Sequence, residues 1–335
     1  MNPPRVAVVV INWNSGTCLA DCLPSVLAQT LPPAELVIID NASSDDSPAA
    51  GRRALEAAGR ASSCRVVWVM NRQNEGFSRA ANQGIAATTG DWVLLLNPDA
   101  VLSPAFLEEA WGALRARPEA GSLAGKVLRF DHRTLDTTGQ FVRADGRVRE
   151  RGYGEVDHGQ YEQPGEVFSV CGAVALYRRT MLEDVALDGE YFDEDFFAFY
   201  EDADLGWRAQ RRGWRCRYQP TAVAYHARGG TNPSGARLWA RWQMPRRPTA
   251  IQFHVLLNRH LMLIKNEPAG RLWLHWPLLL WADGVDLGYL LLARPRLLTW
   301  APRAAALLRR ALDKRRRMAQ SRPVPAPTRS GAGAG

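Results

Sequence analysis

The sequence predicts an α/β fold built on a parallel β-sheet with helices on both faces. Short apolar runs rich in β-branched residues alternate with helix-length segments over the first hundred residues. The runs are apolar throughout, which is typical of strands buried on both faces, and the alternation is typical of βαβ units. Polar residues directly follow three of the runs, at the sheet edge where folds of this class bind ligands.

Four strands and three helices are expected in this first part. Each predicted strand is a short run dominated by Val, Ile and Leu, and each predicted helix lies between two such runs. We expect strands at residues 6–11, 36–40, 65–69 and 92–96, and helices at residues 17–27, 45–58 and 78–87.

The pattern changes after residue 121, where turns containing Gly and Asp separate shorter strand-like segments. The tail from residue 319 is rich in Pro, Ser and Gly, so we expect it to be disordered. Between them we expect strands at residues 123–130, 140–142, 147–152, 167–177, 215–218 and 222–225, and helices at residues 199–212 and 250–265.

Residues 271–300 allow two interpretations. A membrane span needs about 20 mostly apolar residues, but polar and helix-breaking residues interrupt this segment at His275, Pro277, Asp283 and Asp286. Flanking arginines and four tryptophans favour instead a helix lying in the plane of a membrane surface. These tryptophans are Trp273, Trp276, Trp281 and Trp300. The alternative is an ordinary helical hairpin packed on the domain.

The net charge of +8 is divided unevenly along the chain. Residues 1–205 hold 18 basic and 30 acidic side chains, whereas residues 206–335 hold 24 basic and 4 acidic side chains. A basic C-terminal part favours an anionic partner, such as phospholipid or a diphosphate. The arginines carry no recognition motif, so we expect no nucleic-acid partner. A general preference of the chain for arginine, with only three lysines, is an alternative source of the excess.

Cysteine usage indicates a reducing compartment. The five cysteines are scattered and form no C-x-x-C pair, which disfavours a disulfide framework or a zinc site. The first apolar run, residues 6–11, lacks the length and cleavage site of a signal peptide. Together with the basic C-terminal part, this favours a cytoplasmic protein that is peripheral on the inner face of the cell membrane.

Polar residues at the strand exits are candidate ligand contacts. The first βα turn begins at Asn12 and lacks G-x-G-x-x-G, which disfavours a dinucleotide cofactor. Asp40 can accept hydrogen bonds from a base or ribose, and Asp99, in the segment Asn97-Pro98-Asp99, suits Mg²⁺ or Mn²⁺ completed by phosphate oxygens. Each aspartate alone is also a common turn residue. Their position at the ligand edge favours a binding site.

Three acids, Glu201, Asp202 and Asp204, follow a run of aromatic residues and begin a predicted helix. A carboxylate shielded in this way can take the proton of an attacking hydroxyl, as inverting sugar transfer requires. A helix N-terminus favours its ionised form. Capping acids on a surface helix are the alternative, and the neighbouring aromatic residues argue against it.

Two further segments carry weaker signals. His226 follows the predicted strand at residues 222–225 and is a candidate metal or phosphate ligand, although a single histidine is more often structural. Asn74 and Gly76 precede a predicted helix whose N-terminus can face phosphate, with ordinary helix capping as the alternative.

Seven segments in order resemble family 2 glycosyltransferases, specifically their bacterial rhamnosyltransferase-like branch. They extend over roughly residues 5–265, and seven weak matches in the correct order make a specific signal. The segments are residues 8–14 (VVVINWN), 37–43 (VIIDNAS), 74–77 (NEGF), 95–99 (LLNPD), 171–173 (CGA), 199–205 (FYEDADL) and 225–226 (YH).

The resemblance implies a GT-A type, Rossmann-like nucleotide-sugar-binding domain over residues 1–265, with a mixed, mostly parallel sheet. A basic, tryptophan-rich helical membrane-interface segment would follow at residues 266–318, and a disordered tail at residues 319–335. The implied nucleotide-sugar contacts are Asn12, Asp40, Asn74, Gly76, Asn97 and Gly172. Asp99 would bind Mg²⁺ or Mn²⁺ with His226, while Asp202 would be the general base and Glu201 would position it or the acceptor.

The implied function is inverting, metal-dependent transfer of one sugar, with L-rhamnose from dTDP-L-rhamnose as the first expectation. The acceptor would be a hydroxyl of a lipid-linked or cell-envelope glycan precursor. Two departures from the family pattern matter. Asn97-Pro98-Asp99 replaces Asp-x-Asp, which lowers the charge at the metal, and residues 210–214 (QRRGW) depart from the Q-x-x-R-W of processive synthases, which favours single-sugar addition.

Two alternatives to this function stay open. Within the same fold, the donor can be a UDP-hexose or a UDP-N-acetylhexosamine. From a different class, the chain can be a non-catalytic nucleotide-binding or membrane-scaffold protein. The presence together of Asp99, Asp202 and His226 argues against a scaffold, which needs none of them. The sequence leaves open whether the chain forms an oligomer.

Overall fold

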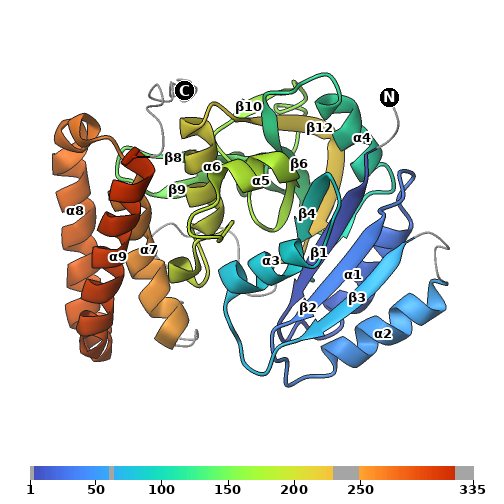
Figure 1. The fold of residues 1–335 in the computed structure, drawn as a ribbon, viewed down its shortest axis with the longest axis horizontal. Coiled ribbons are helices and arrows are strands. Elements are labelled where there is room, and N and C mark those ends of the chain that lie inside the picture. Colours follow the sequence, from blue (N-terminus) through green and yellow to red (C-terminus); the bar gives the residue numbers. More distant parts are fainter. Residues whose placement is uncertain (1–3, 60–63, 229–248, 321–335) are drawn as a thin grey trace.

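The computed structural model describes residues 4–59, 64–228 and 249–320. Its centre is a mixed sheet that has ten strands within those ranges (Figure 1). The strands of this sheet are β1 (Val6–Asn12), β2 (Glu35–Asp40), β3 (Arg65–Met70), β4 (Trp92–Leu96), β5 (Ala100–Leu102), β6 (Ala120–Leu128), β7 (Leu135–Thr137), β10 (Gly165–Val167), β11 (Val174–Arg178) and β12 (Arg215–His226). A separate hairpin pairs β8 (Gln140–Val142) with β9 (Val148–Glu150).

The main strand order is β10-β12-β6-β11-β4-β1-β2-β3, with β5 paired to β12 and β7 to β6. Strands β3, β2, β1 and β4 pair in parallel, and so do β6 and β12. Strand β11 runs antiparallel to both β4 and β6, so β6 and β12 point in the same direction as β1. The sheet is therefore mixed and mostly parallel along its long strands, as the sequence predicted.

Helices cover both faces of the sheet and form a group at one side of it (Figure 1). They are α1 (Cys18–Leu27), α2 (Ser47–Ala57), α3 (Phe77–Ala86), α4 (Phe106–Leu114), α5 (Arg179–Val185), α6 (Glu201–Arg211), α7 (Thr249–Asn266), α8 (Ala269–Ala293) and α9 (Ala301–Gln320), with 3₁₀ turns η1 (Glu194–Phe196) and η4 (Pro295–Trp300).

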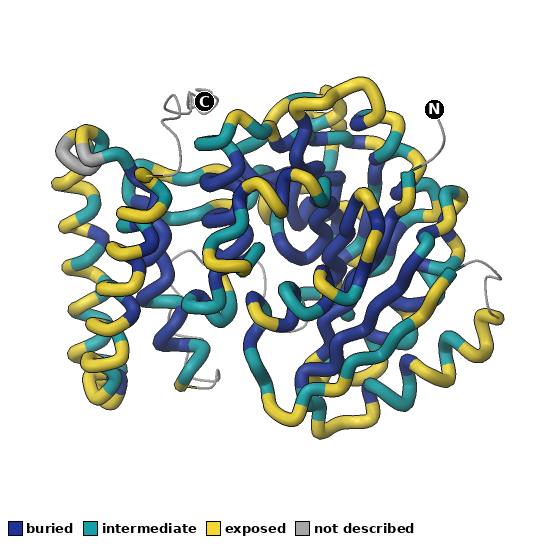
Figure 2. The backbone as a smooth tube through the Cα atoms, viewed as in Figure 1, coloured by how far each residue is buried: buried dark blue, intermediate teal, exposed yellow. Residues whose placement is uncertain are grey.

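The central strands supply two hydrophobic cores, one on each face. On one face Val8 packs with Leu19 and Leu23 of α1, and on the other Val9 packs with Ala81 of α3. Successive side chains of a strand point to opposite faces, so a strand covered on both sides has to be apolar at every position. The central strands are accordingly buried, while the outer sides of the helices are exposed (Figure 2).

A third core and a buried ion cluster attach the C-terminal helices to α6. Trp207 of α6 packs with residues of α7 and α9. Lys265 of α7 is fully buried, with its Nζ 2.8 Å from Asp204 Oδ2, and it also contacts Asp193. Lys314 of α9 reaches the same Asp193 at 2.6 Å. A compact ammonium with three donors can meet two carboxylates in a buried space.

Three strand predictions differ from the structure in detail. The segment predicted as one strand at residues 167–177 forms two strands, β10 and β11, separated by a turn that carries Gly172. The two short strands predicted at residues 215–218 and 222–225 are one strand, β12, with a register shift between Gln219 and Val223. Helices α4 and α5, and strands β5 and β7, had no sequence prediction because they are short and lie beside stronger signals.

The C-terminal part forms helices up to Gln320. Helix α9 therefore continues two residues into the segment predicted as a tail, and residues 321–335 and the Trp273 side chain lie outside the described part of the chain. In helix α8, Asp283 contacts Arg259 and Asp286 accepts hydrogen bonds from Arg147 at 3.1 Å. One side of α8 is thus packed on the domain, as the helical-hairpin alternative expected.

Candidate active site

The carboxyl ends of β1 and β2 lie side by side and hold a buried polar network. Asn12 and Asp40 are partners in the parallel register, and the Asn12 amide donates to Asp40 Oδ1 at 2.8 Å and to Ser47 Oγ at 2.9 Å. Ser43 donates to the Asp40 carboxylate from both its backbone N–H and its hydroxyl. Asn12 therefore lies behind Asp40 and fixes its carboxylate.

Trp13 is a candidate that the sequence analysis did not single out. It follows Asn12 at this edge, and its side chain is 42% exposed, which is unusual for an indole. A flat aromatic face beside a nucleotide site can stack on a base. Only the structure shows its exposure, because a tryptophan next to a buried strand is expected to join the core.

Asn74 and Gly76 are held in one loop by Asn41. The Asn41 amide donates to Asn74 Oδ1 at 2.9 Å, and the Gly76 N–H donates to the same oxygen at 2.9 Å. Gly76 has φ +84°, and a Cβ there would lie 2.5 Å from the Phe197 ring. Only glycine fits this position, because the loop turns left-handed and touches the segment that precedes α6.

Asp99 and His226 meet at the ends of neighbouring strands. His226 Nε2 lies 3.1 Å from Asp99 Oδ1, and His226 Nδ1 lies 2.9 Å from Asp136 Oδ2. Burial disfavours the charged imidazole, but the hydrogen bonds to Asp136 and Asp99 outweigh it and raise the pKa of His226 to about 9. Arg228 also donates to Asp136, which places that carboxylate between two cationic groups.

This pair fits a hard divalent cation that takes further ligands from a substrate. Carboxylate oxygen and imidazole nitrogen are suitable donors, and a carboxylate on the second ring nitrogen, here Asp136, is the usual support of a metal-binding histidine. Within the described ranges, no group of three or more His, Cys, Asp or Glu side chains is arranged to hold a metal ion. Asp99 and His226 would therefore need phosphate oxygens and water to complete the shell.

Asp202 is buried at the first turn of α6 and is held by three donors. Its Oδ2 accepts from the Gly172 N–H at 2.8 Å and from the Gln140 side chain at 2.9 Å, and its Oδ1 accepts from the Ala203 N–H at 2.7 Å. Burial raises the pKa of Asp202 above its ordinary value, and these hydrogen bonds offset only part of the shift. The pKa of Asp202 therefore reflects burial first and hydrogen bonding second.

Glu201 is also buried, and its Oε2 has no hydrogen-bond partner among the described residues. Burial and the neighbouring charges of Asp202 and Asp204 raise the pKa of Glu201 well above its usual range. In its protonated form this carboxyl group can donate a hydrogen bond to a bound hydroxyl or to a neighbouring oxygen.

A chain of hydrogen bonds connects the Asp99 segment to Asp202. The Asn97 N–H donates to the Ala173 carbonyl at 2.8 Å, and the adjacent Gly172 N–H donates to Asp202. Asn97 and His226 stand at the carboxyl ends of β4 and β12, and these strands point the same way as β1 and β2. All ten site residues predicted from the sequence therefore lie at one edge of the sheet or beside it.

Three residues of this edge come from a part of the chain that gave no functional signal. Asp136, Gln140 and Glu150 lie on short strands between β6 and β10. Glu150 is surrounded by arginines in sequence, which suggests a solvent-exposed strand, yet burial raises its pKa to about 7. No pattern in the sequence marks them, because their contacts are all with distant residues.

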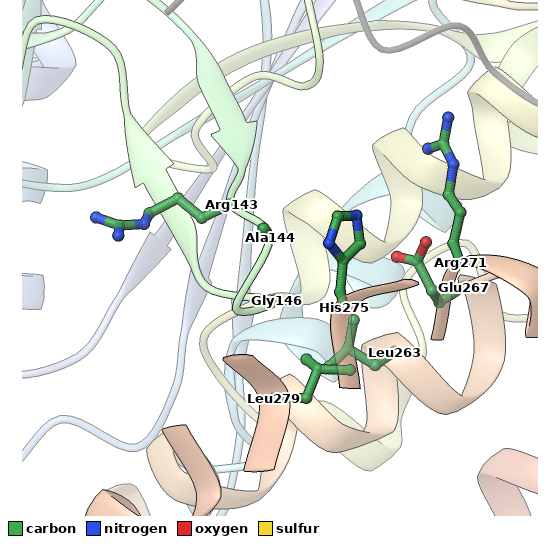
Figure 3. Close-up of a pocket in the computed structure, with 8 residues that line it drawn as sticks. All are labelled: Arg143, Ala144, Gly146, Leu263, Glu267, Arg271, His275 and Leu279. Atoms are coloured by element: carbon green, nitrogen blue, oxygen red, sulfur yellow. The ribbon is translucent and has the colours of Figure 1, made fainter. Parts of the chain in front are cut away.

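A separate small hollow lies between the β8–β9 hairpin and helices α7 and α8 (Figure 3). Basic, acidic and apolar side chains line it, including Arg143, Glu267, Arg271, His275 and Leu279. None of the predicted site residues contributes to it. The hollow is therefore distinct from the polar edge described above.

Comparison of the sequence with known families and proteins gives a consistent result. Residues 3–245 match the family model described as "Glycosyltransferase like family 2". Two relatives are a poly-beta-1,6-N-acetyl-D-glucosamine synthase of Staphylococcus aureus (strain COL), 24% identical over 225 residues, and an N-acetylglucosaminyltransferase of Azorhizobium caulinodans, 28% identical over 236 residues. The alignments cover 64% and 66% of this chain, which spans about half the length of these relatives (47% and 54%).

Two solved structures share the fold. A mannosyltransferase from Pyrobaculum calidifontis, in complex with GDP-Man and Mn²⁺, aligns over 96% of this chain and 80% of its own, with a TM-score of 0.53 and 20% identity. GalNAc-T7, with UDP, GalNAc and Mn²⁺, aligns over 79% of this chain and 48% of its own, with a TM-score of 0.57 and 14% identity. At these identities the likeness shows the fold alone, which is of the GT-A type.

Proposed function

The chain belongs to the family described as glycosyltransferase-like family 2, and we propose that it transfers one sugar, with inversion, from a nucleoside diphosphate to an acceptor hydroxyl. The observation that supports this most is the gathering of Asp99, His226 and Asp202 at one edge of the sheet. A pair that can hold a metal ion under the diphosphate and a buried base at the same edge are what an in-line displacement at an anomeric carbon needs.

In the proposed reaction, Asp202 takes the proton of the acceptor hydroxyl as its oxygen attacks the anomeric carbon. The raised pKa of Asp202 makes it a stronger base than an exposed aspartate, while its three donors keep the carboxylate fixed. Protonated Glu201 would hydrogen-bond the acceptor beside it.

On the opposite side of the sugar, Asp99 and His226 would hold Mg²⁺ or Mn²⁺ under the diphosphate. Such an ion neutralises the negative charge that develops on the leaving group, a contribution of several kcal/mol to the barrier. Asp40 would accept a hydrogen bond from the nucleoside, Trp13 would stack on its base, and the loop of Asn74 and Gly76 would line the donor side.

We propose a UDP-N-acetylhexosamine as the first candidate donor. Its support is that the two relatives are an N-acetylglucosamine polymer synthase and an N-acetylglucosaminyltransferase. The second candidate is dTDP-L-rhamnose, which rests on the resemblance of the sequence segments to the rhamnosyltransferase-like branch. In either case the departure of residues 210–214 from Q-x-x-R-W favours addition of a single sugar.

We further propose that the acceptor is a lipid-linked or cell-envelope glycan precursor and that the protein works at the inner surface of the membrane. Among the described residues, one helical segment, Leu274–Ala293, is long and apolar enough to span a membrane by length and composition, and 6% of it is buried in the structure. A non-catalytic scaffold is the competing function, and the fixed geometry of Asp202 argues against it.

A panel of nucleotide sugars tests the proposal. Purified protein is incubated with Mn²⁺ and UDP-N-acetylglucosamine, UDP-glucose, dTDP-L-rhamnose or GDP-mannose, and release of the nucleotide diphosphate is measured. We expect slow hydrolysis of one of them, with UDP-N-acetylglucosamine first. Binding of nucleotides without hydrolysis of any donor, with or without a polyprenyl-linked acceptor, would favour the scaffold.

A further inference from the structure

The side chain of Gln140 lies between the buried carboxylate of Asp202 and the partly buried carboxylate of Glu150. Its Nε2 donates to Asp202 Oδ2 at 2.9 Å and to Glu150 Oε1 at 3.0 Å. An ionised carboxylate accepts hydrogen bonds but donates none. The amide therefore uses both of its hydrogens on the two acids.

Ser169 fixes which end of this amide faces the acids. The Ser169 hydroxyl donates to Gln140 Oε1 at 2.7 Å, and the Gln140 N–H donates to the Ser169 carbonyl at 2.8 Å. With its oxygen occupied on one side, the amide presents its nitrogen to Asp202 and Glu150 on the other. The direction of the Gln140 side chain is thus determined before any substrate binds.

A glycine in α6 permits this arrangement. A Cβ at Gly206 would lie 2.4 Å from the Ser169 Cβ, a distance that would force Ser169 and the amide it holds away from the helix. Gly206 is four residues after Asp202, so the two residues stand one turn apart on α6. The close approach therefore occurs directly beside the proposed base.

We propose that Gln140 is a positioning residue for the general base. It holds the Asp202 carboxylate in the direction that accepts the proton of the acceptor hydroxyl, and Glu150, the second acid on the same amide, keeps the amide nitrogen between the two acids. This inference rests on the proposed function and adds to it a part of the chain, the β8–β9 hairpin, that no motif of the family resemblance includes.

The titratable groups that face Asp202 decide in which direction a substitution shifts its pKa. They are Glu150 from β9, Glu201 on α6, Cys171 in the turn before β11 and Tyr177 on β11. Burial raises the pKa of Glu150 to about 7, with Arg228 acting in the opposite direction, so Glu150 is mostly neutral below that pH. Removing the Gln140 donor should raise the pKa of Asp202, whereas replacing neutral Glu150 by Gln should leave the pKa of Asp202 nearly unchanged below pH 7.

Two variants separate the hydrogen bond of Gln140 from the presence of Glu150. The acidic limb of the pH profile of kcat/KM is measured for hydrolysis of UDP-N-acetylglucosamine, in which water replaces the acceptor. Gln140→Leu should lower kcat about 10- to 100-fold, as expected for loss of one hydrogen bond to a buried charge. It should also move the acidic limb to higher pH. Glu150→Gln replaces a carboxyl group that is mostly neutral at acidic pH, so its acidic limb should stay close to that of the wild type below pH 7.

The matched controls are Gln160→Leu and Glu155→Gln, exposed residues between β9 and β10, which should leave the profile unchanged. Calorimetry with UDP checks that each variant is folded. The UDP affinity of each variant should lie within about threefold of the wild type, a difference of less than about 1.4 kcal/mol in binding free energy. An acidic limb of folded Gln140→Leu that coincides with that of the wild type would overturn the inference.

Failure of the proposed function looks different. If Asp202→Asn were as active as the wild type, or if the wild type hydrolysed no nucleotide sugar, the general-base assignment and the inference on Gln140 would both be wrong. An inactive Asp202→Asn together with wild-type behaviour of Gln140→Leu would refute the inference alone. Should Gln140→Leu fail to fold, Ser169→Ala removes the hydroxyl that orients the amide and should move the acidic limb in the same direction. An unmoved limb in folded Ser169→Ala would then overturn the proposal.

Discussion

At the scale of single residues, Asp202 differs from an ordinary helix-capping aspartate in how it is held. Both of its oxygens accept hydrogen bonds, from Gly172, Gln140 and Ala203, and the side chain is buried. A surface cap has a pKa near or below its usual value, whereas burial raises the pKa of Asp202. The sequence could predict the acid and its helix, but not this environment.

Replacing the proposed base should separate catalysis from binding. Asp202→Asn keeps the shape of the side chain and removes its ability to take a proton, so turnover should fall by about 10²- to 10⁴-fold. Calorimetry should give a nearly unchanged nucleotide affinity. The exposed Asp313→Asn serves as the control, and a fully active Asp202→Asn would remove the base assignment.

Asp99 can be tested through metal-dependent binding instead of turnover. If Asp99 and His226 hold the ion under the diphosphate, Mn²⁺ should increase the affinity of the wild type for UDP, and Asp99→Ala should abolish that increase. Titrations of UDP with and without Mn²⁺ measure both. The exposed Asp21→Asn on α1 is the control, and an equal effect of Mn²⁺ on Asp99→Ala would disprove the metal role.

His254 gives a pH dependence of stability. Burial lowers the pKa of His254 to about 4, so the folded protein keeps it neutral while the unfolded chain binds a proton below about pH 6.5. Stability contributed by the neutral form is present above pH 6.5 and is lost as pH falls toward 4. Relative to His254→Gln, the wild type should lose about 2 kcal/mol of unfolding free energy between pH 7 and pH 5. Unfolding free energies that change with pH by the same amount in the wild type and His254→Gln would contradict this prediction.

At the scale of elements, the turn that leads into α6 is held in an unusual conformation. Phe197, Phe199 and Tyr200 all have positive φ (62°, 74° and 71°), which costs free energy for a side chain with a Cβ. Asn258 of α7 stabilises the turn, because its Nδ2 lies within 2.7–2.8 Å of the carbonyl oxygens of Phe196, Ala198 and Phe199. Helix α7 thus fixes the approach to Glu201 and Asp202.

Removing this amide should loosen the turn. Asn258→Ala leaves the carbonyl oxygens without their donor, so we expect a loss of about 1–3 kcal/mol in unfolding free energy and a lower kcat at unchanged UDP affinity. Thermal unfolding and donor hydrolysis measure the two effects. Asn258→Asp keeps the shape but not the donor, and should lose at least as much. Wild-type stability of Asn258→Asp would show that the amide hydrogen bonds are unimportant.

Among the elements, the βα units of the first hundred residues were predicted to within one or two residues at most ends, because their apolar runs are continuous. The β8–β9 hairpin was predicted as two strands, at residues 140–142 and 147–152, but its role was not. One of its ends holds Asp202 through Gln140, and Arg147 near its turn pairs with Asp286 of α8. Pairings across more than sixty residues leave no local pattern in the sequence.

At the scale of the whole molecule, helix α8 turns an apolar face outward. Trp281 and Leu292 are 75% and 90% exposed, and Leu274 is 71% exposed, while Asp283 and Asp286 face the domain. Exposed apolar surface of this extent is rare on a monomer and marks a surface for a partner or a membrane. Flanking arginines, including Arg294 and Arg296, suit anionic lipid.

Vesicle flotation tests this face. The wild type should float with vesicles of phosphatidylcholine and phosphatidylglycerol. The double variant Trp281→Ser, Leu292→Ser should partition into the vesicles at least about tenfold more weakly, because each side chain contributes roughly 1.5–3 kcal/mol when it is buried in the membrane. Leu312→Ser, an equally apolar exposed position on α9, is the control. These substitutions are preferable to deleting residues 271–335, which would also remove Lys314 from the buried carboxylate of Asp193. Equal flotation of the wild type, the double variant and Leu312→Ser would contradict a role for α8 in membrane binding. Absence of flotation of the wild type would also contradict it.

The sequence by itself determined the parallel α/β sheet, the polar strand exits and the acid-bearing helix. Each of these depends on short-range patterns: apolar runs, turn residues and their order along the chain. It also carried enough of the family segments to indicate a glycosyltransferase.

Only the tertiary structure decided which carboxylates are buried, which residues hold them and which face of α8 is free. Asp136, Gln140 and Glu150 acquire their roles from partners that are distant in sequence, and burial, which shifts their ionisation, is a property of the packed chain. The physical reason is that hydrogen bonding and desolvation depend on distances in space, which a local pattern does not encode.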